Sequence, residues 1–372
     1  MNCAVVGVLG GGQLARMMAL AGLSLGLRFK FLDPSSAACA APLGEFVASG
    51  YDDPDGLSRF ASCADVVTYE FENVPQNALY FVRQRVSIFP PPEALAVASD
   101  RLKEKTLFRK LDIPTPPFAA VSSRADLDIA MESLGLPAVL KTRSQGYDGK
   151  GQFVLQRKND ADAAWRQMKG AASILERYVE FDREVSLLAV RSKHGEIAFY
   201  PLSENEHQKG ILHISRSRPG DVMEAAAQKH VRRLMDHLDY VGLLALEFFQ
   251  AGECLLANEM APRVHNSGHW TIEGAATSQF ENHLRAGLGL PLGSTAPRGH
   301  AAMVNIIGLP PVSEKVLAVP GAKLHLYGKE PLPGRKTGHV TLVESTENDL
   351  EDGLRKILYA VNREEQCAQC VA

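Results

Sequence analysis

Strand-like and helix-like segments alternate through the first 95 residues, and this alternation restricts the fold more than any other feature of the chain. Residues 2–9 are an apolar run that ends in glycines, which predicts a buried strand. Residues 14–25 carry apolar side chains at helical spacing, with Gly26 as the stop. Further strands are predicted in LRFKFLDP, DVVTYEFENVP and VSIFPPP. Because parallel strands need crossover helices, residues 1–95 are predicted to form a parallel α/β domain.

The character of the sequence changes beyond residue 98. A helix is predicted through DRLKEKTLFRKL with Ser99 as its N-cap, followed by short strands around a helix at about residues 161–169. Longer β-rich segments begin at Glu184, and KLHLYGK and GHVTLVES with a closing helix suggest a small appended β unit. We therefore expect an α/β and α+β protein in three parts: residues 1–98 as an N-terminal α/β domain, residues 99–183 as a linker helix with a small domain, and residues 184–372 as a C-terminal β-rich domain with the appended unit.

Composition narrows the classes of partner. With 40 Lys and Arg against 43 Asp and Glu, the formal net charge is −3, which gives no reason to expect a nucleic acid or an acidic membrane as the main partner. No segment approaches the ~20 apolar residues of a membrane helix. Six cysteines, among them Cys3, Cys39, Cys63 and Cys254 in apolar surroundings, favour buried reduced thiols in a cytoplasmic protein. The C-x-x-C of Cys367 and Cys370 lacks further ligands nearby and is interpreted as incidental.

The segment VGVLGGGQLARMM suggests a nucleotide-binding loop. Gly10, Gly12 and Ala15 fit the G-x-G-x-x-G/A spacing, and Asp33 follows near the usual distance. This pattern favours a dinucleotide site, but such a loop at a helix N-terminus can also receive another anion. The sequence alone leaves both possibilities open.

A second glycine-rich segment, KTRSQGYDGKGQFVL, reads as a hairpin. Gly146, Gly149 and Gly151 at its tip, with Lys150, can place backbone N–H groups and an ammonium over phosphates. A mobile surface hairpin without a ligand explains the same residues equally well.

Two glutamates occur in a predicted hairpin, LLALEFFQAGECLLANEM. With a turn at residues 251–253, strand alternation places Ala245, Glu247 and Phe249 on one face and Leu255, Ala257 and Glu259 on one face of the partner strand. Two carboxylates among apolar side chains repel each other, and a shared Mg²⁺ (or Mn²⁺) relieves the repulsion. Alternatively, one glutamate pairs with an arginine and the other reaches water. We favour the metal, because the following polar segment supplies Asn258, Arg263, His265 and Asn266.

Together these segments resemble the ATP-grasp superfamily and, within it, the N5-carboxyaminoimidazole ribonucleotide synthetases of purine biosynthesis. The resemblance spans nearly the whole chain and rests on the order of these motifs: GGGQLARM, TYEFENVP, DRLKEKTLFRKL, LKTRSQGYDGKGQ, LERYVEFDREVS, GILHISRSR, LANEMAPRVHNSGHWT and GRKTGHV. It implies an ATP-grasp fold of three domains: an N-terminal α/β domain, a middle domain that bears a flap and a C-terminal β-rich domain. ATP lies between two antiparallel sheets.

The resemblance also implies roles for individual residues, each named by its position in this sequence. Those implied for ATP are Arg101, Lys141, Gly146, Tyr147, Asp148, Gly149, Lys150, Gly151, Gln152, Glu176, Arg177, Tyr178, Val179, Glu184, His207, Asn258 and Glu259, with Glu247 and Glu259 also on the metal. Those implied for the ribonucleotide are Gln13, Glu70, Tyr147, Asp148, Lys329 and Arg335 or Lys336, those for bicarbonate are Arg263 and His265, and Asn266 is implied as a further substrate-binding residue. Arg263, His265, Asp148 and Lys141 are the implied catalytic residues, and Glu70 or Asp148 orients or deprotonates the substrate amine.

The implied reaction carboxylates 5-aminoimidazole ribonucleotide with bicarbonate and ATP through carboxyphosphate, in an enzyme expected to be a homodimer. In this interpretation the first glycine loop faces the ribonucleotide, as an anion cradle, rather than a dinucleotide. The alternatives are a related enzyme that activates formate, an NAD-dependent dehydrogenase and an ATP-binding module without catalysis. Arg216 and Arg218 depart from the family pattern, and we expect them on the surface or at a subunit contact.

Overall fold

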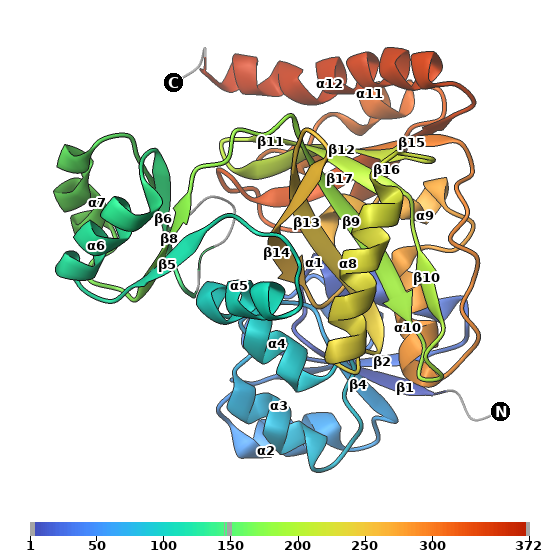
Figure 1. Cartoon of the computed structure of the whole chain (residues 1–372). Coiled ribbons are helices and arrows are strands. Elements are labelled where there is room, and N and C mark those ends of the chain that lie inside the picture. Colours follow the sequence, from blue (N-terminus) through green and yellow to red (C-terminus); the bar gives the residue numbers. More distant parts are fainter. Residues whose placement is uncertain (1–3, 145, 147–150, 370–372) are drawn as a thin grey trace.

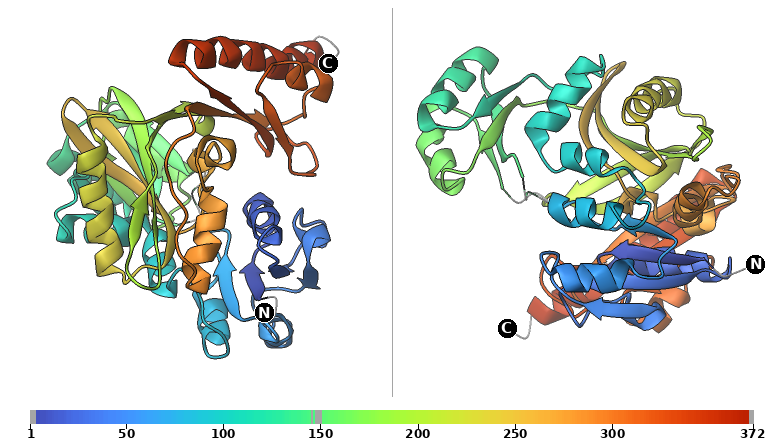
Figure 2. Two further views of the ribbon diagram at one scale, coloured as in Figure 1. Left: turned by 90° about the vertical axis from the view of Figure 1, so that its right-hand side faces the viewer. Right: turned by 90° about the horizontal axis from the view of Figure 1, so that it is seen from below.

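The computed structural model describes residues 4–144, 146 and 151–369, with side chains described as far as residue 361. Three sheets organise the chain, one for each of the three parts in sequence order (Figure 1, Figure 2). None of the helices in the described ranges is long and apolar enough to span a membrane.

The first sheet is parallel, in the order β3-β2-β1-β4, which confirms the predicted α/β domain. Its strands are β1 (Val5–Leu9), β2 (Arg28–Asp33), β3 (Glu45–Ala48) and β4 (Val66–Tyr69), and its helices are α1 (Gln13–Leu23), η1 (Ala41–Leu43), α2 (Pro54–Ala61), α3 (Gln76–Arg83) and α4 (Pro92–Ala98). VSIFPPP does not form the predicted strand, because only Ile88 bridges the sheet, at Val67, before the prolines end the pairing. The cysteine prediction holds for Cys39, which is buried, but Cys63 and Cys254 are exposed.

Helix α5 (Arg101–Lys110) connects the first domain to the second. Its N-cap is Asp100 and not the predicted Ser99, which ends α4. The Asp100 carboxylate accepts hydrogen bonds from the backbone N–H of Leu102 at 2.9 Å and from the Arg143 side chain at 3.0 and 2.5 Å. Asp100 therefore fixes the start of α5, and with it the side chain of Arg101.

The second sheet is antiparallel and forms the small domain at the side of the molecule (Figure 1). Its order is β5 (Phe118–Val121), β8 (Ser173–Arg177), β6 (Ala138–Thr142) and β7 (Gln152–Leu155), with α6 (Arg124–Leu134), η2 (Lys158–Asp160) and α7 (Ala161–Gln167). The helices bury one face of the sheet around Leu127, Leu140 and Ala164. Strands β6 and β7 form the predicted glycine-rich hairpin, with Lys141 opposite Gln152.

The third sheet has nine strands and is the largest in the molecule. Its order is β14 (Cys254–Ala261), β13 (Gly242–Ala251), β9 (Arg183–Arg191), β11 (Leu202–Gln208), β12 (Ile211–Arg218), β15 (His300–Ile307), β17 (Lys336–Glu344) and β16 (Lys323–Leu326), with β10 (Ile197–Phe199) beside β9. The helices are α8 (Glu224–His237), η3 (Asn266–Gly268), α9 (Thr271–Gly274), α10 (Gln279–Leu288), α11 (Ser313–Leu317) and α12 (Glu347–Gln369). The last β segments continue the same sheet, because β15 pairs with β12 and carries β17 and β16, and together with α11 and α12 they enclose a hydrophobic core of their own.

The two unexpected arginines tie α12 to this sheet. Arg216 contacts Glu206 and Glu351, and Arg218 contacts Glu204 and Glu347. Arg216 is buried and Arg218 is half-buried. The expectation that both lie freely on the surface is therefore not met. Both join the C-terminal helix to β12 within one chain.

A buried histidine joins the first domain to the third. His283 on α10 accepts a hydrogen bond at Nδ1 from the backbone N–H of Leu243 at 3.0 Å. Its Nε2 therefore carries the proton and donates to Thr68 Oγ1 on β4 at 2.8 Å. Complete burial lowers the pKa of His283 to about 3. The neutral ring is thus part of the folded structure.

This histidine predicts a specific pH dependence of stability. In the unfolded chain its pKa is near 6.5, so the unfolded state binds a proton between about pH 6.5 and pH 3 that the folded state does not. The stabilisation is complete above pH 6.5 and declines as the pH falls. Between pH 7.5 and pH 5.0, urea titrations should show that wild-type protein loses about 2 kcal/mol more unfolding free energy than His283→Gln. Equal losses would contradict this role.

Candidate active site

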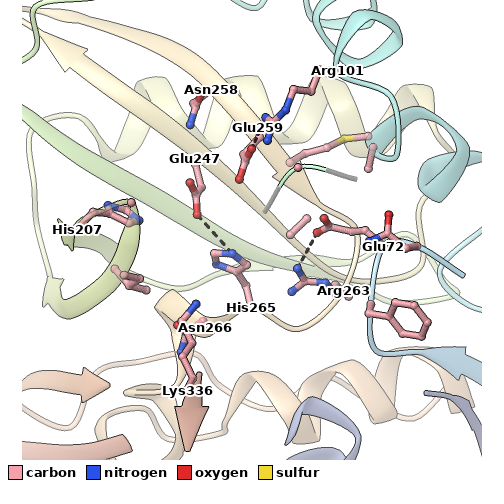
Figure 3. A pocket seen from close by; sticks show the side chains of 18 of the residues that line it. Glu72, Arg101, His207, Glu247, Asn258, Glu259, Arg263, His265, Asn266 and Lys336 are labelled. Carbon is pink, nitrogen blue, oxygen red and sulfur yellow. Dashed lines mark hydrogen bonds and ion pairs between the residues drawn. The ribbon is translucent and has the colours of Figure 1, made fainter. Parts of the chain in front are cut away.

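A cavity of about 860 Å³ is lined by residues from all three parts of the chain. It brings together most of the residues predicted from the sequence: Gln13, Glu70, Arg101, Lys141, Gly146, Gln152, Glu184, His207, Glu247, Asn258, Glu259, Arg263, His265, Asn266, Lys329, Arg335 and Lys336. The side chains labelled in Figure 3 converge from the β13–β14 hairpin, the loop after it and the neighbouring elements. Residues far apart in the sequence therefore share one enclosed site.

Some predicted residues do not line this cavity. Glu176 lies buried behind its wall, while Arg177 and Tyr178 are exposed and Val179 is half-buried on the segment after it. Gly151 precedes β7 with a φ of 72°. Their implied roles toward ATP stay predictions. Tyr147, Asp148, Gly149 and Lys150 fall outside the described residues, so the flap contacts predicted for them stay predictions as well.

A β-bulge brings the two predicted carboxylates together. Leu246 pairs with Met260 and Phe248 pairs with Ala257, so Glu247 alone opposes the two residues Asn258 and Glu259. A bulge of this kind can turn the side chains of both residues on the bulged strand, here Asn258 and Glu259, toward the same side of the sheet. Glu247, Asn258 and Glu259 consequently point into the cavity together (Figure 3).

The bulge corrects the face assignment made from strict alternation. Leu255 and Ala257 pack with Phe248 and Met260 in the core on the far side of the sheet, and not beside Glu259. The extra residue shifts the alternation between Ala257 and Glu259, which is why a carboxylate that would otherwise enter the core reaches the cavity.

The two carboxylates have different partners and different proton affinities. Glu259 Oε2 lies 2.6 Å from Arg101 Nη1. Burial would raise the pKa of Glu259, but the charge of Arg101 outweighs it and lowers this pKa to about 2. Glu247 Oε1 lies 3.4 Å from His265 Nε2, and burial together with the charge of Glu259 raises the pKa of Glu247 to about 8. The alternative of a glutamate–arginine pair is thus realised for Glu259.

One polar atom beside the carboxylates has no hydrogen-bond partner among the described residues. This atom is the buried Asn258 Oδ1, an oxygen that can accept a hydrogen bond or coordinate a cation. Within the described ranges, no three His, Cys, Asp or Glu side chains gather as a metal-binding group. Any cation here would therefore take its remaining ligands from a bound molecule.

A pair of buried lysines shares one carboxylate behind the cavity wall. Glu176 Oε2 lies 3.0 Å from Lys141 Nζ and 3.4 Å from Lys105 Nζ, and Lys105 also donates to the Ala257 carbonyl at 3.0 Å. Burial would raise the pKa of Glu176, but the two lysines lower it to about 2. Glu176 therefore holds the Lys141 ammonium in place at the cavity edge.

Lys105 and Glu104 were not singled out in the sequence. Glu104 lines the cavity and accepts a hydrogen bond from the Met260 backbone N–H at 2.7 Å. Helical spacing could have identified them. Positions 101, 104 and 105 share one face of the predicted helix, and this face is turned toward one strand, β14.

Side chains in the loop after β14 are held by buried partners. Arg263 Nη2 donates to Glu72 Oε1 at 2.7 Å, a carboxylate that the sequence interpretation did not single out. Asn266 exchanges side-chain hydrogen bonds with Asn305 at 3.0 and 2.7 Å. The pKa of His265 lies well below its usual value because the ring is buried and Arg263 is close.

His207 and Glu184 form a further pair on the cavity wall. His207 Nδ1 lies 3.2 Å from Glu184 Oε2. Burial would lower the pKa of His207, but the Glu184 carboxylate outweighs it and the pKa is raised.

The first glycine loop is filled by carboxylates of the chain itself. Glu70 accepts hydrogen bonds from the backbone N–H groups of Gly12 and of Ala15, the latter at 3.1 Å, and Asp33 accepts from Gly11 at 2.9 Å. Internal carboxylates therefore occupy these three N–H groups, and the role of the loop as an anion cradle for the ribonucleotide stays a prediction. Gln13, whose side chain hydrogen-bonds Lys329, still faces the cavity.

Comparison with known proteins identifies the class. The ATP-grasp domain family matches residues 106–280, the ribonucleotide synthetase preATP-grasp domain matches residues 3–99, and the phosphoribosylaminoimidazole carboxylase C-terminal domain matches residues 301–353. These matches agree with the three sheets and the shared cavity. The chain is an ATP-dependent ligase of the ATP-grasp superfamily.

Individual relatives narrow the family. N5-carboxyaminoimidazole ribonucleotide synthase of Pseudomonas aeruginosa is 54% identical over 337 residues, covering 91% of this chain and 94% of the relative. The crystal structure of the Thermus thermophilus synthetase superposes with a TM-score of 0.92 at 55% identity, covering 96% of this chain and 99% of that one. The Aspergillus clavatus enzyme, in complex with ADP and 5-aminoimidazole ribonucleotide, gives 0.91 at 31% identity over 97% and 99%. The chain belongs to the N5-carboxyaminoimidazole ribonucleotide synthase family.

The glycine loop generates a prediction about stability. A Cβ atom at Gly12 would lie 2.5 Å from Glu70 Oε1, so Gly12→Ala should displace the Glu70 carboxylate from the two N–H groups that it caps. We expect a loss of about 2 kcal/mol in unfolding free energy, as for a lost helix cap. In a Glu70→Ala background the same substitution should cost under about 0.5 kcal/mol, because the clash is gone. A full cost in both backgrounds, measured by urea denaturation, would refute the explanation.

Proposed function

We propose that the chain carboxylates 5-aminoimidazole ribonucleotide with bicarbonate, at the expense of ATP, to give N5-carboxyaminoimidazole ribonucleotide, ADP and phosphate. The activity fits the family of the chain and the printed names of its relatives. The observation that carries the proposal is the single cavity, which joins carboxylates and a lysine suited to ATP with Gln13, Glu70 and Lys329 of the opposite wall. A two-substrate ligase needs this arrangement, because a reactive intermediate must meet the second substrate without crossing water.

The phosphate end of ATP is assigned to Lys141 and Arg101. Lys141 is held by Glu176 at 3.0 Å and Arg101 by Glu259 at 2.6 Å, so both cations are oriented before a nucleotide arrives. Preoriented positive charge stabilises the transferring phosphoryl group without reorganisation during the reaction. In this scheme bicarbonate attacks the γ-phosphorus, ADP leaves, and carboxyphosphate forms in the same cavity.

The residues at the bulge fit a divalent cation. Glu247, Asn258 and Glu259 line the cavity side by side at the bulge, the Asn258 Oδ1 has no partner among the described residues, and hard cations such as Mg²⁺ prefer oxygen ligands. When bound, Mg²⁺ would neutralise charge on the nucleotide phosphates. Phosphate oxygens would supply the ligands that the chain does not.

Arg263 and His265 are assigned to bicarbonate. Both lie beyond the carboxylate pair, and Glu72 fixes the Arg263 guanidinium at 2.7 Å. Lys329, Arg335 and Lys336 enter the cavity from the segment before β17 and supply positive charge suited to the ribonucleotide phosphate. Glu70 is committed to the α1 N-terminus, which favours a binding role for this carboxylate over that of a free base.

The dehydrogenase alternative loses its main support. A dinucleotide pyrophosphate needs the N–H groups of the glycine loop, and those of Gly11, Gly12 and Ala15 already donate to Asp33 and Glu70. A cytoplasmic location and a homodimer stay predictions of the sequence and the resemblance.

Substitution of one bulge carboxylate tests the activity. Glu259→Gln keeps the shape of the side chain and an acceptor for Arg101, but it removes the charge that would bind the cation. We expect carboxylation to fall by at least about 100-fold while the fold survives. Phosphate release should be measured from ATP plus bicarbonate, with and without the aminoimidazole ribonucleotide, and with formate in place of bicarbonate.

Glu253→Gln is the matched control. This glutamate lies on the same hairpin, is exposed at its turn and does not line the cavity, so its loss should leave the rate unchanged. Wild-type turnover by Glu259→Gln would overturn the metal assignment. Phosphate release with formate but not bicarbonate would overturn the proposed substrate.

A further inference from the structure

A line of buried polar side chains ends at the ring of His265. Asn205 Nδ2 donates to Ser186 Oγ at 3.0 Å, Ser186 Oγ donates to Ser267 Oγ at 2.7 Å, and Ser267 Oγ lies 2.8 Å from His265 Nδ1. Asn205 is 6% exposed, and Ser186 and Ser267 are completely buried. Nothing in the proposed reaction uses the first three of these residues, yet each of them bonds to the next and the last bonds to the His265 ring.

The register of the large sheet explains how the line reaches the cavity. Ser186 on β9 stands opposite Glu247 on β13, and Asn205 on β11 is two residues beyond the partner of Ser186. Paired residues of neighbouring strands share a face, so these polar side chains lie on the same face as the cavity carboxylate. The η3 turn covers this face, and Ser215 Oγ lies 2.8 Å from both the Ser267 carbonyl and Asn205 Oδ1, two acceptors that share its single proton.

The hydrogen bonds have a direction. The direction is set by a main-chain donor: the backbone N–H of Ser267 donates to His265 Nδ1 at 3.4 Å, so Nδ1 carries a lone pair. The Ser267 proton then points to Nδ1 and the Ser186 proton points to Ser267, and Asn205 turns its Nδ2 toward Ser186. Two donors directed at one ring nitrogen require that this nitrogen carry a lone pair.

We propose that Asn205, Ser186 and Ser267 are positioning residues that hold His265 as the tautomer with its proton on Nε2. Nε2 then presents an N–H group to the cavity, 3.4 Å from the Glu247 carboxylate. An N–H group attracts an anion such as bicarbonate, whereas the other tautomer would turn a lone pair toward it. The effect of this tautomer on bicarbonate binding rests on the proposed function, in which His265 contacts bicarbonate.

The main chain of His265 is fixed separately, so the line acts on the ring alone. The completely buried Gln279 side chain accepts from the His265 backbone N–H at 2.8 Å and donates to the His265 carbonyl at 2.6 Å. Loss of a hydroxyl from the line should therefore leave the ring near its place and change mainly which nitrogen holds the proton.

Asn205→Asp tests the direction of the line. The introduced carboxylate can only accept, so Ser186 must donate to it, Ser267 must donate to Ser186, and His265 Nδ1 must donate to Ser267. In protein labelled with ¹⁵N-histidine, at a pH where the ring is neutral, wild type should show His265 protonated at Nε2 and the variant at Nδ1. The His265 signals are those missing in His265→Gln.

Ser217→Ala is the matched control. Ser217 is buried on the same sheet, opposite Ser203, and its hydroxyl has no hydrogen-bond partner among the described residues. This variant should keep the wild-type tautomer. If Asn205→Asp does not fold, Ser267→Ala, which adds no charge, should shift the Nδ1 resonance toward that of a nitrogen without an acceptor bond. An unchanged Nδ1 resonance there, or an unchanged tautomer in folded Asn205→Asp, would overturn the line.

Kinetics separate the line from the role of bicarbonate. Each KM is measured with the other two substrates saturating. Asn205→Asp should raise the KM for bicarbonate about tenfold and leave the KM for ATP within about twofold. A merely structural defect would change both constants. A tautomer that changes while the bicarbonate KM does not would overturn the bicarbonate assignment of His265, although the hydrogen-bond line would stand.

Discussion

The β-bulge opposite Glu247 is the constraint on which the site depends. Without the extra residue, strand alternation would turn Glu259 toward the apolar core that contains Phe248 and Met260, where an isolated carboxylate is costly to bury. With it, Glu247, Asn258 and Glu259 face one cavity while the strands on either side keep their register. The bulge thus reconciles a buried hydrophobic hairpin with three polar side chains, and Arg101, reached through α5, compensates one of the charges.

The same requirement, that each buried charge has a partner, organises the rest of the cavity wall. Glu176 is shared by two lysines, Glu72 pairs with Arg263, and Glu70 binds backbone N–H groups at the start of α1. Among these contacts the Glu72–Arg263 pair joins the first domain to the third, and the others fix side chains within one part of the chain. Because breaking such a pair leaves a buried charge uncompensated, these contacts fix geometry more than they add net stability.

The fold could be predicted in outline because its signals are local. Apolar periodicity located the parallel domain, and turn residues located the β13–β14 hairpin, whose ends pair at Ala251 and Cys254. The short strand β3 and the helices between β3 and α5 carried weaker signals and were not assigned. Ser99 and Asp100 are both residue types that suit an N-cap, and only the structure shows that the Asp100 carboxylate receives the helix N–H groups and is held by Arg143.

Most residues of the site could be predicted from the sequence, but the contacts between them and the faces that they occupy could not. The family resemblance named Glu70 as a ligand contact, but it did not reveal that the loop glycines make room for this carboxylate. The bulge left no signal in the alternation of apolar residues, since Leu255 and Ala257 fit either face. Lys105 resembles any charged helix residue until the helix is placed against β14 and the lysine is found to be completely buried. Long-range packing decides all three.

Two histidines show how backbone groups assign the roles of side chains in this structure. At His283 a strand N–H occupies Nδ1, so Nε2 donates across a domain contact, and at His265 a turn N–H approaches Nδ1 in the same way, so Nε2 faces the cavity. At His283 this main-chain group, which cannot titrate, selects the nitrogen that carries the proton, whereas at His265 it acts together with the Ser267 hydroxyl. The protonation pattern of the site is therefore a consequence of the fold: the η3 turn that delivers the N–H is itself held by Ser215 and Gln279, on elements distant in sequence. A chain that formed the hairpin but misplaced this turn would keep its carboxylates and lose the donor that faces them.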